Sequence, residues 1–337
     1  MDDALVSVVI PVYNGERFLG RTLASALAQT YSPIEFLIVD DSSTDRTAMI
    51  AEAAAASDSR IRYFRRPKSG TAASRNFGIS QARGDLIAPL DADDLWHPTK
   101  ISRQVEVMNA SSPEVGLVYC WSIEIDENDF IIPSLSSLKR MKKSTAQGRV
   151  TAELARGCFI EAGSMPLMKR SKLLAIGGYD VDLQPQGADD WKLYLTLSEI
   201  CDFAVVPKYL VGYRQVTGSV SRNLTGMSQS QDNVIRWLFE RRPDFSDELK
   251  RHAAYHVSVF MAHRAIDNSQ FGAALGYVGK ACKTHPKGLL DPATFRFGTR
   301  FLARVAGLGR SKLRQRGLMR QISFNELQCE WPAQIDS

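Results

Sequence analysis

Short apolar runs rich in β-branched residues alternate with amphipathic stretches through the first hundred residues, and this alternation constrains the fold most. The apolar runs are residues 6–12, 34–43, 61–66 and 86–90. Between them, stretches such as 16–29 and 71–82 carry apolar residues at helical spacing. This pattern predicts an α/β fold with a mostly parallel central sheet and helices on both faces. Pro89 conflicts with it, because proline is disfavoured inside a central strand.

The second part of the chain is organised differently. A further strand covers residues 114–121, residues 126–149 are polar, and a helix begins at Asp189. After Asn223 only helical patterns follow. We therefore divide the chain into a first domain and a helical C-terminal region. The boundaries are 1–222 for the domain, with halves 1–112 and 113–222, and 223–337 for the C-terminal region.

Composition and charge narrow the class of protein. The chain has 337 residues, 44% hydrophobic and 23% charged, with five cysteines that show no CxxC or zinc-type spacing. This usage favours reduced thiols in a cytoplasm. The start has no basic segment ahead of an apolar stretch, and no run of roughly 18 apolar residues occurs, so we expect neither a secretory signal nor a membrane span. The expected location is the cytoplasm.

Polar side chains follow three of the predicted strands where each strand ends. Tyr13 follows the first strand, Asp40 the second, and an acidic turn with Asp91, Asp93 and Asp94 the fourth. Ligands of open parallel sheets bind at these carboxyl ends. Neither GxGxxG nor GxxxxGK[ST] is present, which disfavours a dinucleotide site and a P-loop.

Three carboxylates within four residues repel one another and need compensation. A divalent cation is one solution, because Mg²⁺ typically uses one or two carboxylates together with substrate phosphates. The alternative is a solvated loop ahead of the helix that begins near Pro98, since Asp-rich turns are common. The position at a strand end favours the cation.

Two long stretches carry a family resemblance. They are VSVVIPVYNGERFLGRTLASALAQTYSPIEFLIVDDSSTD and GTAASRNFGISQARGDLIAPLDADDLW. Together they resemble family 2 glycosyltransferases with the GT-A fold, and the resemblance covers roughly residues 5–220. It implies a Rossmann-like GT-A sheet, with a nucleotide-sugar-binding half at 1–112 and an acceptor-binding half at 113–222. It also implies a divalent metal cofactor, Mg²⁺ or Mn²⁺.

The resemblance assigns expected roles to individual residues. The nucleobase is surrounded by the end of the first strand and the acid of the second: Pro11, Val12, Tyr13 and Asp40. A carboxylate suits this position because it accepts the N3–H of uracil or thymine. Asp41 has an equally good alternative as a helix cap.

Further roles fall on the helix over 71–82 and on the acidic turn. Arg75 is implied to reach towards the nucleotide; otherwise it is a helix-surface arginine. Asp91 is implied to contact ribose and, with Asp93, to ligate the metal. Asp94 has the weakest claim of the three acids.

A second acidic motif, GADDW, lies at residues 187–191. It resembles the acidic motif on the family's acceptor side. The chemistry needs a general base that takes a proton from the attacking sugar hydroxyl; we assign Asp190, with Asp189 as the fallback. Acids at a helix start also serve capping and the macrodipole. Trp191 fits a sugar-binding wall or the core equally.

One position departs from the family pattern. Family members often carry YRxHxGS after the acceptor motif, and here the stretch reads YRQVTGSVSRN, with Val216 in place of the histidine. Valine cannot ligate a metal. Either Arg214, Ser219 or Ser221 completes the site, or metal binding is weaker.

The C-terminal segment 296–320 contains eight basic residues and no acid, although the whole chain carries only +5. Apolar residues at helical spacing accompany the arginines, which resembles a surface helix on anionic lipid and would make the protein peripheral at the inner membrane face. The alternatives are a helix packed on the catalytic domain and a subunit interface. Nucleic acid is not expected as a partner, because no nucleic-acid module accompanies the charge.

The expected function is an inverting, metal-assisted glycosyltransferase of the hexosyl- or hexosaminyl-transferring class. It moves a sugar from a nucleoside-diphosphate sugar, with UDP favoured, to a glycan or glycolipid acceptor in polysaccharide biosynthesis. Two rivals are a non-catalytic nucleotide-sugar-binding protein, which Val216 keeps open, and a sugar-nucleotide pyrophosphorylase. The pyrophosphorylase should open with a glycine- and arginine-rich phosphate loop, which the sequence lacks.

Overall fold

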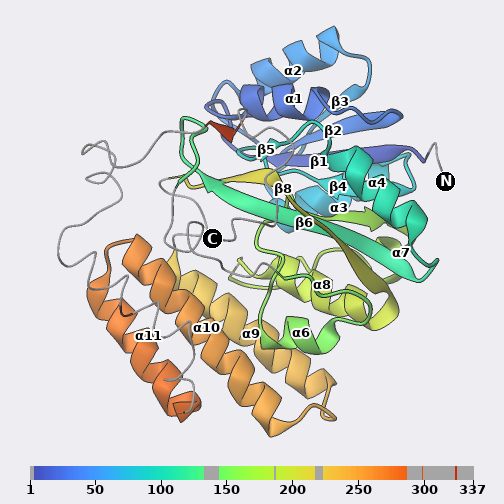
Figure 1. The fold of residues 1–337 in the computed structure, drawn as a ribbon. Helices are drawn as coiled ribbons and strands as arrows, with labels where there is room; N and C mark the ends of the chain where they lie inside the picture. The colour runs from blue at the N-terminus through green and yellow to red at the C-terminus, as the bar shows by residue number, and fades with distance from the viewer. Residues whose placement is uncertain are drawn as a thin grey trace, which may run out of the picture.

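A single eight-stranded sheet organises the molecule (Figure 1). The computed structural model describes residues 4–132, 144–185, 187–216, 223–286, 298 and 323–324. In spatial order the strands are β3 (Ile61–Arg65), β2 (Ile34–Asp40), β1 (Val6–Val12), β4 (Leu86–Pro89), β7 (Leu167–Lys169), β6 (Val115–Ile125), β8 (Asp202–Arg214) and β5 (Leu95–Trp96).

The two halves of the sheet differ in strand direction. β3, β2, β1 and β4 run parallel, as the alternating pattern predicts. β7 pairs antiparallel with β4 and β6, and β5 pairs antiparallel with β8, while β6 and β8 run parallel. The sheet is therefore mixed, and its parallel half brings the carboxyl ends of β1, β2 and β4 to one edge.

Helices cover the sheet on both faces (Figure 1). In the first half they are α1 (Leu19–Leu27), α2 (Thr47–Ser57), α3 (Thr71–Gln81) and α4 (Lys100–Ala110). The second half adds α6 (Thr151–Arg156), α7 (Arg170–Ala175) and α8 (Asp189–Ile200). α3 packs on β1 and β2, and α4 packs on β6 and β8. The short distance between β1 and α3 depends on Gly78, where a Cβ atom would lie 2.3 Å from a Val9 methyl group.

Three helices follow the sheet: α9 (Leu224–Arg241), α10 (Asp247–Asp267) and α11 (Phe271–Thr284). They lie side by side at the lower left of Figure 1, and α10 contacts α6, α9 and α11. Apolar residues of α9 and α10, such as Val234 and Ala262, belong to the same buried cluster as the strands. The domain boundary at 222/223 remains a prediction. Buried residues on both sides of it belong to one hydrophobic core. Within the described ranges, no helix is long and apolar enough to cross a membrane.

Pro89 is tolerated in the central strand β4 because of the side to which a backbone N–H group at this position would point. The amides of Leu86 and Leu90 donate to the carbonyls of Leu5 and Val9, on the β1 side. Backbone N–H groups of successive residues point to opposite sides of a strand, so an N–H group at position 89 would point towards β7. The pairing of β7 with β4 already ends at Ile87. Pro89 therefore removes no hydrogen bond from the sheet.

Candidate active site

Hydrogen bonds join the loops that follow β1 and β2. Val12 and Asp40 are partners in the β1–β2 register. Beyond them, the Asn14 amide donates to Ser43 Oγ (2.9 Å), and the Thr44 amide donates to Asn14 Oδ1 (2.8 Å). A rigid rim therefore surrounds this edge of the sheet.

The residues expected around the nucleobase differ in accessibility. Pro11 and Val12 are buried in β1, whereas the Tyr13 ring is 46% exposed. The Lys68 ammonium group lies 3.8 Å from the centre of the Tyr13 ring, within cation–π range. Tyr13 and Lys68 thus offer an exposed aromatic face and a positive charge at the same rim. Lys68 was not expected from the sequence, because no motif marks the loop between β3 and α3.

Asp40 and Asp41 both hold loop backbone in place. Asp40 is fully buried and accepts hydrogen bonds from the Ser43 amide (2.7 Å) and the Tyr63 hydroxyl (2.8 Å). Asp41 accepts from the amides of Ser69 (2.7 Å) and Gly70 (2.9 Å), directly before α3. Asp41 therefore holds the loop that leads into α3, and the expected role as a cap of the following helix, α2, is wrong. A nucleobase could form a hydrogen bond with Asp40 only if the Tyr63 hydroxyl group moved away from this carboxylate.

The acidic turn after β4 contains one acid with a structural role. Asp94 is fully buried, and its carboxyl group accepts from Ser164 Oγ (2.6 Å) and from the Arg214 amide (2.9 Å). Ser164 Oγ in turn accepts from the Asp91 amide (2.9 Å). Burial, followed by the charges of Asp93 and Asp91, raises the pKa of Asp94 well above its usual range. Asp94 thus holds the turn in place, which agrees with its weak claim to a ligand role.

Arg214, at the end of β8, supports the same turn from the other side. Its Nε donates to the Asp93 carbonyl (2.6 Å), its Nη1 donates to the Asp126 carbonyl (2.7 Å), and its Nη2 forms an ion pair with Asp129 (2.6 Å). The side chain is completely buried. Arg214 therefore positions the backbone of the acidic turn and does not replace the missing histidine as a ligand. Val216 is half-buried, and Ser219 and Ser221 lie outside the described residues.

Arg75 joins the acidic turn to the second acidic motif. Its Nη2 donates to Asp91 Oδ1 (2.6 Å), and its Nη1 donates to Asp190 Oδ1 (2.7 Å) and Asp189 Oδ2 (3.1 Å). The guanidinium is only 5% exposed, so Arg75 is not a helix-surface arginine. The carboxylates of Asp91 and of the neighbouring pair Asp189 and Asp190 lie far apart in the chain. The Arg75 guanidinium group holds all three together. We call Arg75, Asp91, Asp189 and Asp190 the acidic cluster.

The acids at the start of α8 face this cation instead of capping their own helix. Asp190 Oδ1 is held by Arg75, and its Oδ2 accepts no hydrogen bond from the described part of the chain. The side chain is 29% exposed. Burial raises the pKa of Asp190 to about 7, helped by Asp189 and Asp91 and opposed by Arg75. A carboxylate with a pKa near neutrality and one open oxygen can accept a proton from a bound hydroxyl group. Trp191 is buried and donates to the Leu154 carbonyl (2.8 Å), which makes it a core residue.

Gly163 borders the acidic cluster and was missed by the sequence analysis. A Cβ atom at this position would lie 2.7 Å from Arg75 Nη2, 3.0 Å from Asp91 Oδ2 and 3.1 Å from Asp190 Oδ2. Only glycine therefore leaves these groups in place. A lone glycine in EAGSMP gives no periodic signal, so its role could be recognised only from the fold.

The site contains more carboxyl groups than positively charged groups. Among the described side chains, two guanidinium groups, those of Arg75 and Arg214, adjoin five carboxyl groups, those of Asp91, Asp93, Asp94, Asp189 and Asp190. Burial and the charge of Asp91 raise the pKa of Asp93 to about 6. Among the described residues, no group of three or more metal-ligating side chains occurs. Asp93 and Asp91 alone still fit Mg²⁺ or Mn²⁺, because such ions usually complete their shell with substrate phosphates and water.

Sequence comparisons place the chain among known relatives. The profile described as "Glycosyl transferase family 2" matches residues 7–177. An uncharacterized glycosyltransferase of Rickettsia typhi is 31% identical over 239 residues, which cover 69% of this chain and 70% of the relative. The Escherichia coli UDP-Glc:alpha-D-GlcNAc-diphosphoundecaprenol beta-1,3-glucosyltransferase WfgD is 33% identical over 162 residues, which cover 46% of this chain and 62% of WfgD.

Solved structures agree on the fold. The mannosyltransferase PcManGT of Pyrobaculum calidifontis, in complex with GDP-Man and Mn²⁺, matches with a TM-score of 0.58 at 17% identity and covers 90% of this chain and 86% of its own. TarS 1-349 of S. aureus, in complex with UDP-GlcNAc, matches with a TM-score of 0.52 at 17% identity, with 92% and 85% covered. The expected GT-A fold is confirmed. Because the family profile covers more than half of the sequence, this chain belongs to glycosyltransferase family 2 and is a nucleotide-sugar glycosyltransferase.

Proposed function

We propose that this protein transfers a hexosyl or hexosaminyl residue, with inversion, from a UDP-sugar to a glycan or lipid-linked acceptor in polysaccharide biosynthesis. The observation that carries the proposal is the acidic cluster. There a carboxylate from the donor-side turn (Asp91) and two from the start of α8 (Asp189 and Asp190) meet at one buried guanidinium, that of Arg75. Donor and acceptor groups can therefore be brought to the same point.

The residues on the donor side have separate roles. Tyr13 and Lys68, at the rim formed by the ends of β1 and β3, receive the nucleotide base. Asp93 and Asp91 would hold a divalent cation, which would supply positive charge to the leaving diphosphate. Arg75 is already placed beside Asp91 to bind the same anionic group.

Asp190 acts as the general base. Its Oδ1 is fixed by Arg75, while its Oδ2 takes the proton of the attacking acceptor hydroxyl as that oxygen bonds to the anomeric carbon. Attack from the side of α8, opposite the nucleotide, gives inversion in a single displacement. Asp189 stabilises the position of Arg75 through the 3.1 Å contact.

The choice of donor and acceptor rests on relatives. WfgD is named as a UDP-Glc transferase acting on a GlcNAc-diphosphoundecaprenol, TarS was solved with UDP-GlcNAc, and PcManGT with GDP-Man. Two of the three use uridine nucleotides, so UDP remains the first choice.

A transfer assay tests the proposal. UDP-Glc, UDP-GlcNAc and GDP-Man are each incubated with Mn²⁺ and a GlcNAc-diphosphate-lipid, and the anomeric configuration of any product is read by NMR. We expect transfer from one UDP-sugar, with inversion. Asp190→Asn should lower kcat by roughly 10²–10⁴-fold and leave UDP binding unchanged. A retained configuration, or full activity of Asp190→Asn, would contradict the mechanism.

A further inference from the structure

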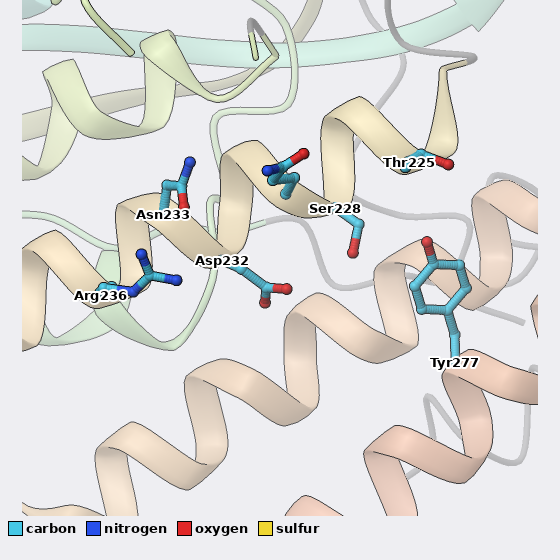
Figure 2. Close-up of a pocket in the computed structure, with 7 residues that line it drawn as sticks. Thr225, Ser228, Asp232, Asn233, Arg236 and Tyr277 are labelled. Atoms are coloured by element: carbon cyan, nitrogen blue, oxygen red, sulfur yellow. The ribbon is translucent and has the colours of Figure 1, made fainter. Parts of the chain in front are cut away.

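A polar groove lies on the helical region, outside the acidic cluster (Figure 2). Its volume is about 350 Å³, the room of roughly a dozen water molecules. One wall is a face of α9, and the other is Tyr277 of α11. The lining residues are Thr225, Ser228, Gln229, Asp232, Asn233, Arg236 and Tyr277.

The lining chemistry suits a polyhydroxylated ligand. The α9 wall contributes two hydroxyl groups, two carboxamides, one carboxylate and one guanidinium, and none of the described residues that line the groove has an aliphatic side chain. These groups both donate and accept hydrogen bonds, as neighbouring sugar hydroxyls require. Tyr277 adds an aromatic ring with a polar tip, which can pack on the C–H face of a sugar ring. Figure 2 shows this ring directed from α11 towards the Thr225 and Ser228 end of α9.

The charges in the groove are largely balanced. Asp232 forms an ion pair with Lys280 of α11 (3.0 Å), which links the two walls. Arg236 is exposed, and it makes no ion pair with any residue that the structure describes. The groove can therefore take a neutral saccharide and leaves one cation available for an acidic substituent.

The helix that lines the groove contacts the loop that precedes α8, the helix that contains Asp190. Asn233 Nδ2 donates to the Gln184 carbonyl (3.0 Å), five residues before Asp189 in the chain. A Cβ atom on Gly187 would lie 3.7 Å from the Met227 Cα atom of α9. The helix that forms the groove thus packs directly against the loop that leads into α8, on the acceptor side of the acidic cluster.

We infer that this α9–α11 groove binds a saccharide unit of the acceptor, beyond the sugar whose hydroxyl is attacked. The inference rests on the proposed function. The sugar ring lies against Tyr277, and its hydroxyl groups bond to Gln229 and Ser228. An acceptor anchored there extends past Gly187 towards Asp190.

Saturation-transfer NMR on the full chain tests this assignment. The probes are cellobiose, N,N′-diacetylchitobiose and glucuronic acid at millimolar concentration. We expect at least one to bind the wild type, and Tyr277→Ala and Gln229→Ala to weaken that binding roughly tenfold or more. Tyr277→Phe should retain most of it, because the ring remains. Leu275→Ala is the matched control, since Leu275 is 54% exposed on the same helix and does not line the groove.

A UDP titration with Mn²⁺ on the same variants separates this inference from the proposed function. Intact UDP binding in every variant, with saccharide binding lost only in the groove variants, supports the groove. UDP binding to the wild type without binding of any saccharide probe overturns the groove and leaves the transferase in place. Equal losses in Leu275→Ala and Tyr277→Ala also overturn it. Absence of UDP binding counts against the proposed function itself.

Discussion

Arg75 and Gly163 determine how the candidate site is assembled at the scale of single residues. Arg75 supplies the positive charge that three converging carboxylates share, and Gly163 leaves the space in which they meet. The sequence identified the acids and Arg75 as site residues, because each belongs to a motif. It could not show that Arg75 pairs with Asp189 and Asp190, since these partners lie more than a hundred positions away and only the folded sheet brings them together.

The pH profile tests Asp190. Asp190 must be ionised to accept a proton, and its pKa in the free enzyme is about 7. We therefore expect kcat/KM for transfer to rise with pH and to level off above about 7. The measurement is kcat/KM from pH 5 to pH 9, at saturating Mn²⁺. A profile that is flat between pH 6 and pH 8 would remove Asp190 from the role of base.

Gly163→Ala tests the space around Arg75. The added methyl group would displace the Arg75 guanidinium from Asp91 and Asp190. We expect lower kcat/KM and a loss of about 1–3 kcal/mol in the free energy of unfolding. Gly276→Ala is the control, because its Cβ atom meets nothing within 4 Å and alanine favours a helix. Wild-type activity of Gly163→Ala would show that the cluster tolerates rearrangement.

At the scale of elements, long periodic segments were predictable and very short ones were not. β1 to β4 and the helices between them follow the expected order, since each carries several turns or alternations of pattern. β7 has three residues and β5 has two, which is too few for a period to be recognised. Their antiparallel pairing makes the sheet mixed, and β8 ends at Arg214 beside the acidic turn.

Arg214→Met tests how β8 supports that turn. The substitution removes one of the two arginines that pair with the partly exposed Asp129 carboxylate, leaving Arg21 (2.9 Å), and it takes the charged donor from the Asp93 carbonyl. We expect urea unfolding to show a loss of about 1–3 kcal/mol, because the Asp93 and Asp126 carbonyl groups lose their charged donor. Arg103→Met removes an exposed pair with Glu106 and should change stability by less than about 0.5 kcal/mol. Equal stability of the two variants would mean that Arg214 does not anchor the turn.

At the scale of the whole molecule, the acidic site costs stability in the absence of a bound cation. The Asp93 carboxyl group has a pKa of about 6 in the folded chain and about 3.8 when unfolded. Between these values the folded state binds more protons, so this group lowers stability as pH rises through that window.

Asp93→Asn removes this effect. The variant should be more stable than the wild type at pH 8, by on the order of 1–3 kcal/mol, and the difference should vanish near pH 4. Urea unfolding of both proteins at the two pH values, without divalent cations, measures it. A variant less stable than the wild type at pH 8 would show that Asp93 makes favourable contacts when ionised.

The most direct test of the central claim is calorimetric titration of UDP and GDP into the wild type and Asp93→Asn, each with and without Mn²⁺. The proposed function predicts that UDP binds the wild type much more tightly with Mn²⁺, and that Asp93→Asn loses this difference but retains the metal-independent binding. Equal affinity with and without Mn²⁺ in the wild type would contradict a metal held at Asp93 and Asp91. No binding of either nucleotide would contradict the transferase itself.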